Sequence, residues 1–558
     1  MPPAAPPALT AKMRRAVDAA RAGRAAEALK LCEAILAAAP AALEPRLLRA
    51  QIAASAGRPG DAIAELRRAL RHHPAEARVW TPLGALAARH LGASDRDALA
   101  ELAVRAGVPS PLLAQVRRTL AAPTPLRRAE DAIEAGDAER AVEIARAAAE
   151  ARPDDAAAHA GHARALEAAG RAGEALDALD RRIAASPPGA IAPRADRALL
   201  LQGMGRLGGA DALLRELIAA HPQEGGLYRL WATGARVAAD EPLLAVMERL
   251  WAGRDVRQRA ELGFALAKGL EDAGRHGEVF AVLHAANGAV AKAAPFDMEA
   301  ELADVARWRA ALSDLGQAAA GPGPVAGPAP IFVAGLPRSG TTLIERVLAR
   351  GAGIEAGGEL GLLAPHVLRH LPPGGPAAGP DAVREIGAGY RAALSRRFGG
   401  AARVTDKSMQ LWKILPLLTA ALPEARTLVV RRDPRDVGLS IYQQYFAPGS
   451  QRFASDLRAI GRVLRLFDES VAHWRARAPD TFREISYDAF VADPDAGAED
   501  LAEAAGLPPG ALAGPDASGG LVRTLSVAQA RAPVHGRSSG RWRRYEAELA
   551  PLIEELER

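Results

Sequence analysis

The stretch that decides the fold of the C-terminal half spans residues 331–351 and reads IFVAGLPRSGTTLIERVLARG. Residues 331–333 are apolar and either β-branched or aromatic, which predicts a strand, and residues 342–350 carry helical periodicity. Gly335 and Gly340 are separated by four residues, the G-x-x-x-x-G frame of a loop whose backbone N–H groups hold phosphate at a helix N-terminus. The stretch therefore predicts a strand, a tight phosphate-binding loop and a helix.

The loop differs from that of nucleoside triphosphatases at the positions after its second glycine. Those enzymes need Lys and then Ser or Thr there, for the β- and γ-phosphates and for Mg²⁺. Here the two positions are Thr341 and Thr342, and Arg338 is the only cation inside the loop. Such a loop suits a 5′-phosphate diester that is bound without a metal.

The segment PRSGTTL, residues 337–343, resembles the 5′-phosphosulfate loop of sulfotransferases that use 3′-phosphoadenosine 5′-phosphosulfate (PAPS). The version with Arg after Pro is similar to that of protein tyrosine sulfotransferases and of bacterial tetratricopeptide-repeat sulfotransferases. The resemblance implies that the cofactor is bound here by Pro337, Arg338, Ser339, Gly340, Thr341 and Thr342.

A second segment, LVVRRDPRDVGLS, strengthens this resemblance. Residues 428–430 read as a buried strand, and Arg432 and Ser440 stand eight positions apart. In the family, the Arg and Ser of an R-D-x-R-x-x-x-x-S segment hold the 3′-phosphate of PAPS. The chemistry fits, because an arginine forks a phosphate bidentately and a serine donates a further hydrogen bond.

Further segments extend the resemblance from about residue 330 to the C-terminus. The family's active-site lysine segment is resembled by TDKSM, in which Lys407 follows an expected strand at 403–405. Another recurrent segment near the cofactor is resembled by ISYDAFVADP around Tyr487. TLSVAQARAPV and SSGRWRRYE resemble the closing region, in which a Ser contributes to the active site and a Lys or Arg before Trp reaches the cofactor. Those positions are Ser526 and Arg541.

Sulfuryl transfer to a hydroxyl needs a base, positive charge near the leaving phosphate and in-line positioning. Glu359, after Gly357 and Gly358 in EAGGELGLL, matches the family's catalytic glutamate and is the expected base. Lys407 and Arg338 are expected at the bridging oxygen and the 5′-phosphosulfate, with Ser526 as a supporting donor. On residue chemistry alone, Glu359 also fits a helix-start carboxylate, Lys407 a solvated surface ammonium and Ser526 a helix N-cap.

The first 300 residues carry a repeat. A glycine precedes a proline by seventeen positions five times, and the glycines lie 34 or 35 residues apart within each run: Gly23, Gly57, Gly136, Gly170 and Gly205. This period resembles that of tetratricopeptide repeats, in which glycine turns the chain between two helices and proline follows the second helix. We expect an irregular stretch at about 80–125 and degenerate repeats to about 310. Such arrays bind peptides or proteins on a concave face. The alternative is that the array only scaffolds or dimerises the enzyme.

Residues 318–330 read AAAGPGPVAGPAP, a composition typical of a linker. The expected organisation is therefore a tetratricopeptide-repeat α-solenoid at 8–316, a linker at 317–329 and a sulfotransferase domain at 330–558. The fold class is an N-terminal all-α tetratricopeptide solenoid followed by an α/β P-loop-type PAPS-dependent sulfotransferase domain. A chain that starts near Gly327 would keep every residue assigned to PAPS.

Composition excludes several other classes. Of the 558 residues, 49% are hydrophobic and 25% charged, which disfavours wholesale disorder and a fibrous class. The formal charge of +5 suits an anionic ligand but falls far short of a nucleic-acid-coating surface. A lone Cys32 forms no internal disulfide, no apolar stretch approaches the roughly 20 residues of a membrane span, and no signal peptide is recognisable. We expect a cytoplasmic protein with neither nucleic acid nor membrane as partner.

The sequence thus predicts a PAPS-dependent sulfotransferase whose repeat array recruits a protein or peptide acceptor, with adenosine 3′,5′-bisphosphate as the product. No metal is expected, because His366 and His370 have no carboxylate nearby in a metal-binding pattern. One alternative is a kinase-like P-loop transferase, against which the missing lysine argues. Another is a repeat scaffold with an inactive transferase domain. The acceptor stays open between peptide tyrosine, another protein hydroxyl, a saccharide and a small phenol.

Overall fold

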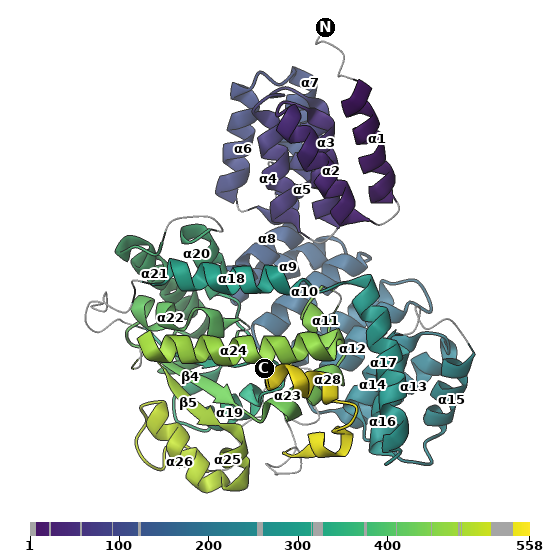
Figure 1. The fold of residues 1–558 in the computed structure, drawn as a ribbon, viewed down its shortest axis with the longest axis vertical. Coiled ribbons are helices and arrows are strands. Elements are labelled where there is room, and N and C mark those ends of the chain that lie inside the picture. Colours follow the sequence, from purple (N-terminus) through teal and green to yellow (C-terminus); the bar gives the residue numbers. More distant parts are fainter. Residues whose placement is uncertain are drawn as a thin grey trace. The chain divides into compact units, whose positions relative to one another are not determined.

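The computed structural model describes most of the chain as helices and five strands (Figure 1). The residues outside the description are 1–6, 22–23, 56–57, 92, 121–123, 254–259, 314, 316–326, 373–376, 409, 448, 478–479, 481 and 515–538. The chain divides into two units, Met1–Asp131 and Ala132–Arg558.

The first unit consists of paired helices. They are α1 (Pro7–Arg21), α2 (Ala25–Ala38), α3 (Leu43–Ser55), α4 (Pro59–Leu70), α5 (Ala77–His90), α6 (Ala93–Arg105) and α7 (Ser110–Leu120), and α8 (Pro125–Glu134) runs across the boundary. Trp80 and Leu83 are fully buried in a core built by α3 to α7. The described residues of the stretch at 80–125, where the repeat signal is lost, therefore lie largely in helices.

The second unit begins with further helical pairs. They are α9 (Ala138–Ala151), α10 (Ala156–Ala168), α11 (Ala172–Ala184), α12 (Ile191–Gly203), α13 (Leu207–Ala220), α14 (Gly225–Gly234), α15 (Pro242–Ala252), α16 (Ala260–Asp272), α17 (His276–Ala293) and α18 (Met298–Ala311). The repeat glycines Gly136, Gly170, Gly205 and Gly274 turn the chain between helices with φ between 75° and 79°. A residue without Cβ adopts this left-handed conformation at no steric cost, which explains the glycine period. Gly23 and Gly57 lie outside the described residues.

An α/β part follows in the same unit. Its strands are β1 (Ala329–Ala334), β2 (Ile354–Ala356), β3 (Arg403–Asp406), β4 (Arg426–Arg431) and β5 (Arg483–Ser486), all parallel in the order β2-β3-β1-β4-β5. Its helices are α19 (Thr341–Leu348), α20 (Leu363–His370), α21 (Pro380–Phe398), α22 (Leu415–Ala421), α23 (Pro434–Tyr442), α24 (Leu457–Arg477), α25 (Tyr487–Ala492), α26 (Pro494–Ala504) and α28 (Ala550–Leu556), with short 3-10 turns η3 (Leu411–Lys413), η4 (Arg452–Ser455) and η7 (Arg541–Tyr545). The expected fold class, helical repeats followed by a parallel-sheet α/β domain, is confirmed.

One hydrophobic core joins the last repeat helices to the α/β part. It runs from Ala195 in α12 to Leu552 in α28. An aromatic seam crosses it: Phe280 of α17 packs on Tyr442 and Tyr545, with ring centroids 5.8 and 5.0 Å apart. The same seam includes Phe264 against Tyr445 and Phe296 against Phe453. The two compact units divide after Asp131. Most of the expected linker at 317–329 lies outside the described residues, so the expected domain boundaries stay a prediction.

None of the described helices is long and apolar enough to cross a bilayer by itself. Helices α17 and α18 meet that test of length and composition only as a pair, and they are bent by 69° at their junction.

Candidate active site

The residues expected in the site follow the carboxyl ends of the five parallel strands. The loop 335–340 follows β1, Glu359 lies beyond β2, Lys407 follows β3, Arg432 follows β4, and Tyr487 follows β5. Strand pairing aligns these ends: Phe332 lies beside Asp406, Ala334 beside Val429 and Arg431 beside Ser486. In open parallel sheets, ligands bind in the crevice outside this edge. The structure thus gathers positions that are up to about 150 residues apart in sequence.

The loop 335–340 depends on its two glycines. Gly340 precedes α19 with φ 104°, and a Cβ there would collide with the ring of Tyr487. A Cβ on Gly335 would lie 2.7 Å from Ser339 Oγ. Pro337, Arg338, Thr341 and Thr342 are partly buried, the two threonines in the first turn of α19. The N-terminus of α19 therefore lies at the loop, and a helix N-terminus favours an anion.

Arg338 is held in an unusual conformation. Its φ of 70° lies in the left-handed region, which costs energy for a residue with a side chain. Its Nε donates to Ser440 Oγ at 2.9 Å, and its carbonyl oxygen accepts from Arg432 Nη1 at 2.9 Å. The 5′ and 3′ segments of the predicted cofactor site are therefore hydrogen-bonded to each other.

Positive charge converges on this point. Burial first, and then the charges of Arg432 and Arg541, lower the pKa of Arg338 to about 10. The guanidinium of Arg432 also lies over the ring of Tyr487, 4.7 Å from its centroid. Ser339 Oγ is buried, with no hydrogen-bond partner among the described residues. Three neighbouring arginines and a buried hydroxyl are a site prepared for an anion, because an anion relieves their mutual repulsion.

Lys407 occupies a buried position between two carboxylates. Its Nζ lies 3.5 Å from Glu359 Oε1 and 3.8 Å from Glu345 Oε2, and its side chain is 4% exposed. Lys407 is therefore not the solvated surface ammonium considered from sequence. The Glu359 side chain is 51% exposed and lies between β2 and α20, outside any helix. Glu359 is therefore accessible from solvent.

Sequence reasoning missed Glu345. This residue of α19 is buried, and its Oε1 accepts hydrogen bonds from Thr405 Oγ1 and from the amide of Gly358, both at 2.8 Å. Burial raises its pKa, although Lys407 and these hydrogen bonds act in the opposite direction. The available signal was an acidic residue among buried Ile344, Val347 and Leu348 on the apolar face of the helix.

The segment around Lys407 is fixed by a second buried carboxylate. Asp406 accepts from Tyr390 Oη and from the amide of Ser408, each at 2.9 Å, and from the Ser408 hydroxyl. Burial raises the pKa of Asp406. These contacts hold the turn that presents Lys407 to the strand edge.

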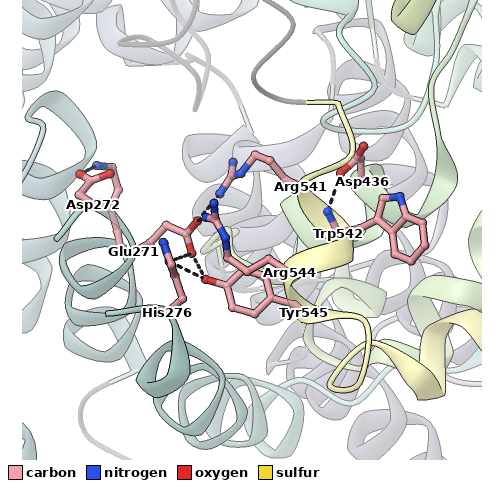
Figure 2. Close-up of polar contacts among 9 residues, drawn as sticks. Glu271, Asp272, His276, Asp436, Arg541, Trp542, Arg544 and Tyr545 are labelled. Carbon is pink, nitrogen blue, oxygen red and sulfur yellow. Dashed lines mark hydrogen bonds and ion pairs between the residues drawn. The ribbon is translucent and has the colours of Figure 1, made fainter. Parts of the chain in front are cut away.

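The C-terminal segment also reaches the site. The amides of Gly540 and Trp542 donate to Asp436 of α23 at 2.6 and 2.9 Å, which places Arg541 beside the helix that carries Ser440 (Figure 2). Ser526 lies outside the described residues. Among those that are described, no group of three or more His, Cys, Asp or Glu side chains is placed to hold a metal.

Comparison with known families agrees with this geometry. Residues 330–509 match the model of the sulfotransferase family, and residues 19–88 match that of the tetratricopeptide repeat. The chain combines tetratricopeptide repeats with a sulfotransferase-family domain. The matched part of the sulfotransferase domain includes the loop, Glu359, Lys407, Arg432 and Ser440, whereas Arg541 lies beyond it.

Individual relatives are distant. An uncharacterized protein of Aquifex aeolicus is 29% identical over 317 residues, which are 54% of this chain and 41% of that protein, so the chain spans about two fifths of its relative. A crystal structure of a Mycobacterium tuberculosis sulfotransferase is 16% identical, with 57% of this chain and 99% of that chain covered and a TM-score of 0.25. The tetratricopeptide-repeat domain of P58(IPK) is 12% identical, with coverages of 55% and 93% and a TM-score of 0.23.

Proposed function

We propose that the protein transfers the sulfuryl group of PAPS to a hydroxyl acceptor. The observation that carries this proposal is the convergence of Arg338, Arg432 and Arg541 near the carboxyl edge of the sheet, at which the buried Lys407 follows β3. A kinase would need the loop lysine that the chain replaces with Thr341. The sulfotransferase family match supports sulfuryl transfer in particular.

The residues present fit PAPS at both of its anionic ends. Residues 337–342 and the first turn of α19 would hold the 5′-phosphosulfate, and Arg432 and Ser440 the 3′-phosphate. Ser440 Oγ accepts from Arg338, so its own O–H is left to donate to a phosphate oxygen. Tyr487 supports this arrangement, because its ring packs on Gly340 and under the guanidinium of Arg432. The buried Ser339 hydroxyl is a further donor directed into the loop.

PAPS, when bound, supplies the sulfuryl group and leaves as adenosine 3′,5′-bisphosphate. Glu359 would take the proton of the acceptor hydroxyl, since it is the exposed carboxylate next to the site. Lys407 would place its positive charge near the leaving phosphate, where a buried cation acts strongly because little water screens it. Glu345 keeps Lys407 in place from the opposite side. Once Glu359 is protonated, its attraction for Lys407 would fall, which would leave more of the charge of the ammonium available to the leaving phosphate.

Thermal unfolding tests the proposal against the kinase alternative. A ligand at 100 times its dissociation constant stabilises the folded state by about 2.7 kcal/mol, a measurable rise in melting temperature. We expect adenosine 3′,5′-bisphosphate to give this rise and ATP with Mg²⁺ not to. Stabilisation by ATP–Mg²⁺ alone would favour the kinase, and stabilisation by neither would favour an inactive domain.

The acceptor and the role of the repeats are part of the same proposal. Tetratricopeptide repeats generally bind proteins, which supports a protein or peptide acceptor, and tyrosine is one candidate hydroxyl. Mass spectrometry of a cell lysate incubated with the protein and labelled PAPS identifies the acceptor directly. The cytoplasmic location stays a prediction from the sequence.

A further inference from the structure

A carboxylate of the repeat array contacts the segment that carries Arg541. Glu271, near the end of α16, accepts a hydrogen bond from Arg541 Nη2 at 2.8 Å on its Oε1. Arg544 Nη1 lies 3.3 Å from the same oxygen, and the Tyr545 hydroxyl donates to Oε2. His276 Nδ1 lies 3.7 Å from Oε2. Figure 2 shows Glu271 at the centre of this group, with the side chains of Arg541, Arg544 and Tyr545 directed toward it.

The charge of Glu271 is maintained in this position. Its side chain is 14% exposed, and burial by itself would raise its pKa. The Tyr545 hydroxyl and the Arg541 guanidinium outweigh burial, so the pKa of Glu271 lies below its ordinary value. Glu271 is therefore ionised at neutral pH and binds Arg541 through a charge-assisted hydrogen bond, the stronger class of such bonds.

The turn around Arg541 is held from two directions. Its backbone is fixed by Asp436 of α23, which accepts from the amides on either side of Arg541. Its side chain is fixed by Glu271 of α16. The charge of Arg541 is also one of those that lower the pKa of Arg338, so the guanidinium lies within electrostatic reach of the phosphate-binding loop.

We propose that Glu271 is a positioning residue that the repeat array contributes to the cofactor site. It acts through Arg541: one carboxylate oxygen holds Nη2 and directs the remaining N–H groups of the guanidinium toward a phosphate of the adenosine cofactor. A guanidinium has five N–H donors, so this contact leaves most of them for an anion. This inference rests on the proposed function. It adds that the repeat array contributes a residue that completes the cofactor-binding site.

The experiment measures the dissociation constant of adenosine 3′,5′-bisphosphate by calorimetry on the full chain. The variants are Glu271→Gln, Arg541→Ala and the double substitution. Glu241→Gln is the matched control, because Glu241 is also in the array, is 15% exposed and pairs with Arg215, within the repeats. Melting temperatures show that each variant is folded. If Glu271→Gln does not fold, Glu271→Asp is measured in its place. This variant keeps the negative charge but shortens the side chain by one methylene, which moves the carboxylate away from Arg541.

We expect Glu271→Gln to weaken binding about tenfold, or roughly 1.4 kcal/mol, and Glu241→Gln to leave it unchanged. In the Arg541→Ala background, Glu271→Gln should change binding by less than about twofold, because the residue through which it acts is gone. Equal effects of Glu271→Gln in both backgrounds, or tighter binding in the single variant, would overturn the proposal. Absence of binding in the wild type would instead reject the proposed function.

Discussion

The most informative prediction concerns where the chain can be truncated without loss of folding and cofactor binding. Composition alone favours a cut at the Ala/Gly/Pro stretch, with a fragment that starts near Gly327. The hydrophobic core continues across that position, from α12 to α28. We therefore expect the fragment 327–558 to lose cooperative folding. A fragment that starts at Thr124 keeps α8 and the whole second unit, and we expect it to fold.

The magnitude follows from the aromatic seam. Removing α16 to α18 uncovers Tyr442, Phe453 and Tyr545, which are 3%, 7% and 1% exposed. Re-exposure of each large apolar side chain costs about 1.5–3 kcal/mol, so the three together cost roughly 5–9 kcal/mol. The hydrogen bond from Asn287 Nδ2 to the Tyr442 carbonyl oxygen is lost as well. Since whole domains are stable by only about 5–15 kcal/mol, the shorter fragment has little or no stability left.

Urea unfolding and binding of adenosine 3′,5′-bisphosphate provide the assay. Fragment 124–558 should unfold in one transition and bind with an affinity close to that of the full chain, whereas fragment 327–558 should aggregate or unfold without a transition. Cooperative unfolding of fragment 327–558, together with an unchanged dissociation constant for adenosine 3′,5′-bisphosphate, would contradict this prediction. That result would make residues 317–329 the true domain boundary.

Three substitutions test individual residues of the site. Glu359→Gln should preserve folding and cofactor binding but lower turnover about 10²–10⁴-fold, and turnover within about threefold of wild type on an accepted substrate would reject Glu359 as the base. Arg432→Ala should weaken adenosine 3′,5′-bisphosphate much more than adenosine 5′-phosphate in calorimetry; equal weakening would show that Arg432 does not serve the 3′-phosphate. Because burial raises the pKa of Glu345, the wild type loses stability as pH rises through that pKa, and Glu345→Gln does not. The melting temperature of this variant relative to wild type should therefore rise as the pH increases from acid to neutral; no change with pH would mean that Lys407 holds Glu345 ionised throughout.

Local signals in the sequence were sufficient for the loop and its strands. The expected strands at 331–333, 403–405 and 428–430 lie inside β1, β3 and β4, and the expected helix at 342–350 overlaps α19. These elements are short, and Gly335 and Gly340 mark the end of β1 and the start of α19, so neighbouring residues determine them. The repeat glycines were informative for the same reason, since Gly136, Gly170 and Gly205 each mark a left-handed turn.

Contacts between distant segments were not predictable in this way. Glu345 reaches Lys407 only because β3 pairs with β1, and strand order is not encoded near either residue. Glu271 and Arg541 are 270 positions apart and meet only through the packing of α16 against the C-terminal segment. A single sequence contains no signal for such a pair. Glu345, by contrast, could be recognised locally as an acidic residue on the apolar face of the expected helix.

The repeat helices of the two units therefore differ in how they contribute to the proposed cofactor site. Those of the second unit share the core of the α/β part and supply Glu271 to the segment that carries Arg541, so they belong to the enzyme itself. Two described core clusters lie in the first unit, one formed mainly by helices α3 to α7 and the other by helices α1 to α3. We therefore propose that a surface of these helices recruits the acceptor. The proposed recruiting role consequently falls on residues 7–120, and fragment 124–558 separates it from catalysis: this fragment should retain sulfation of a small phenol that the full chain accepts and lose most activity on a macromolecular acceptor.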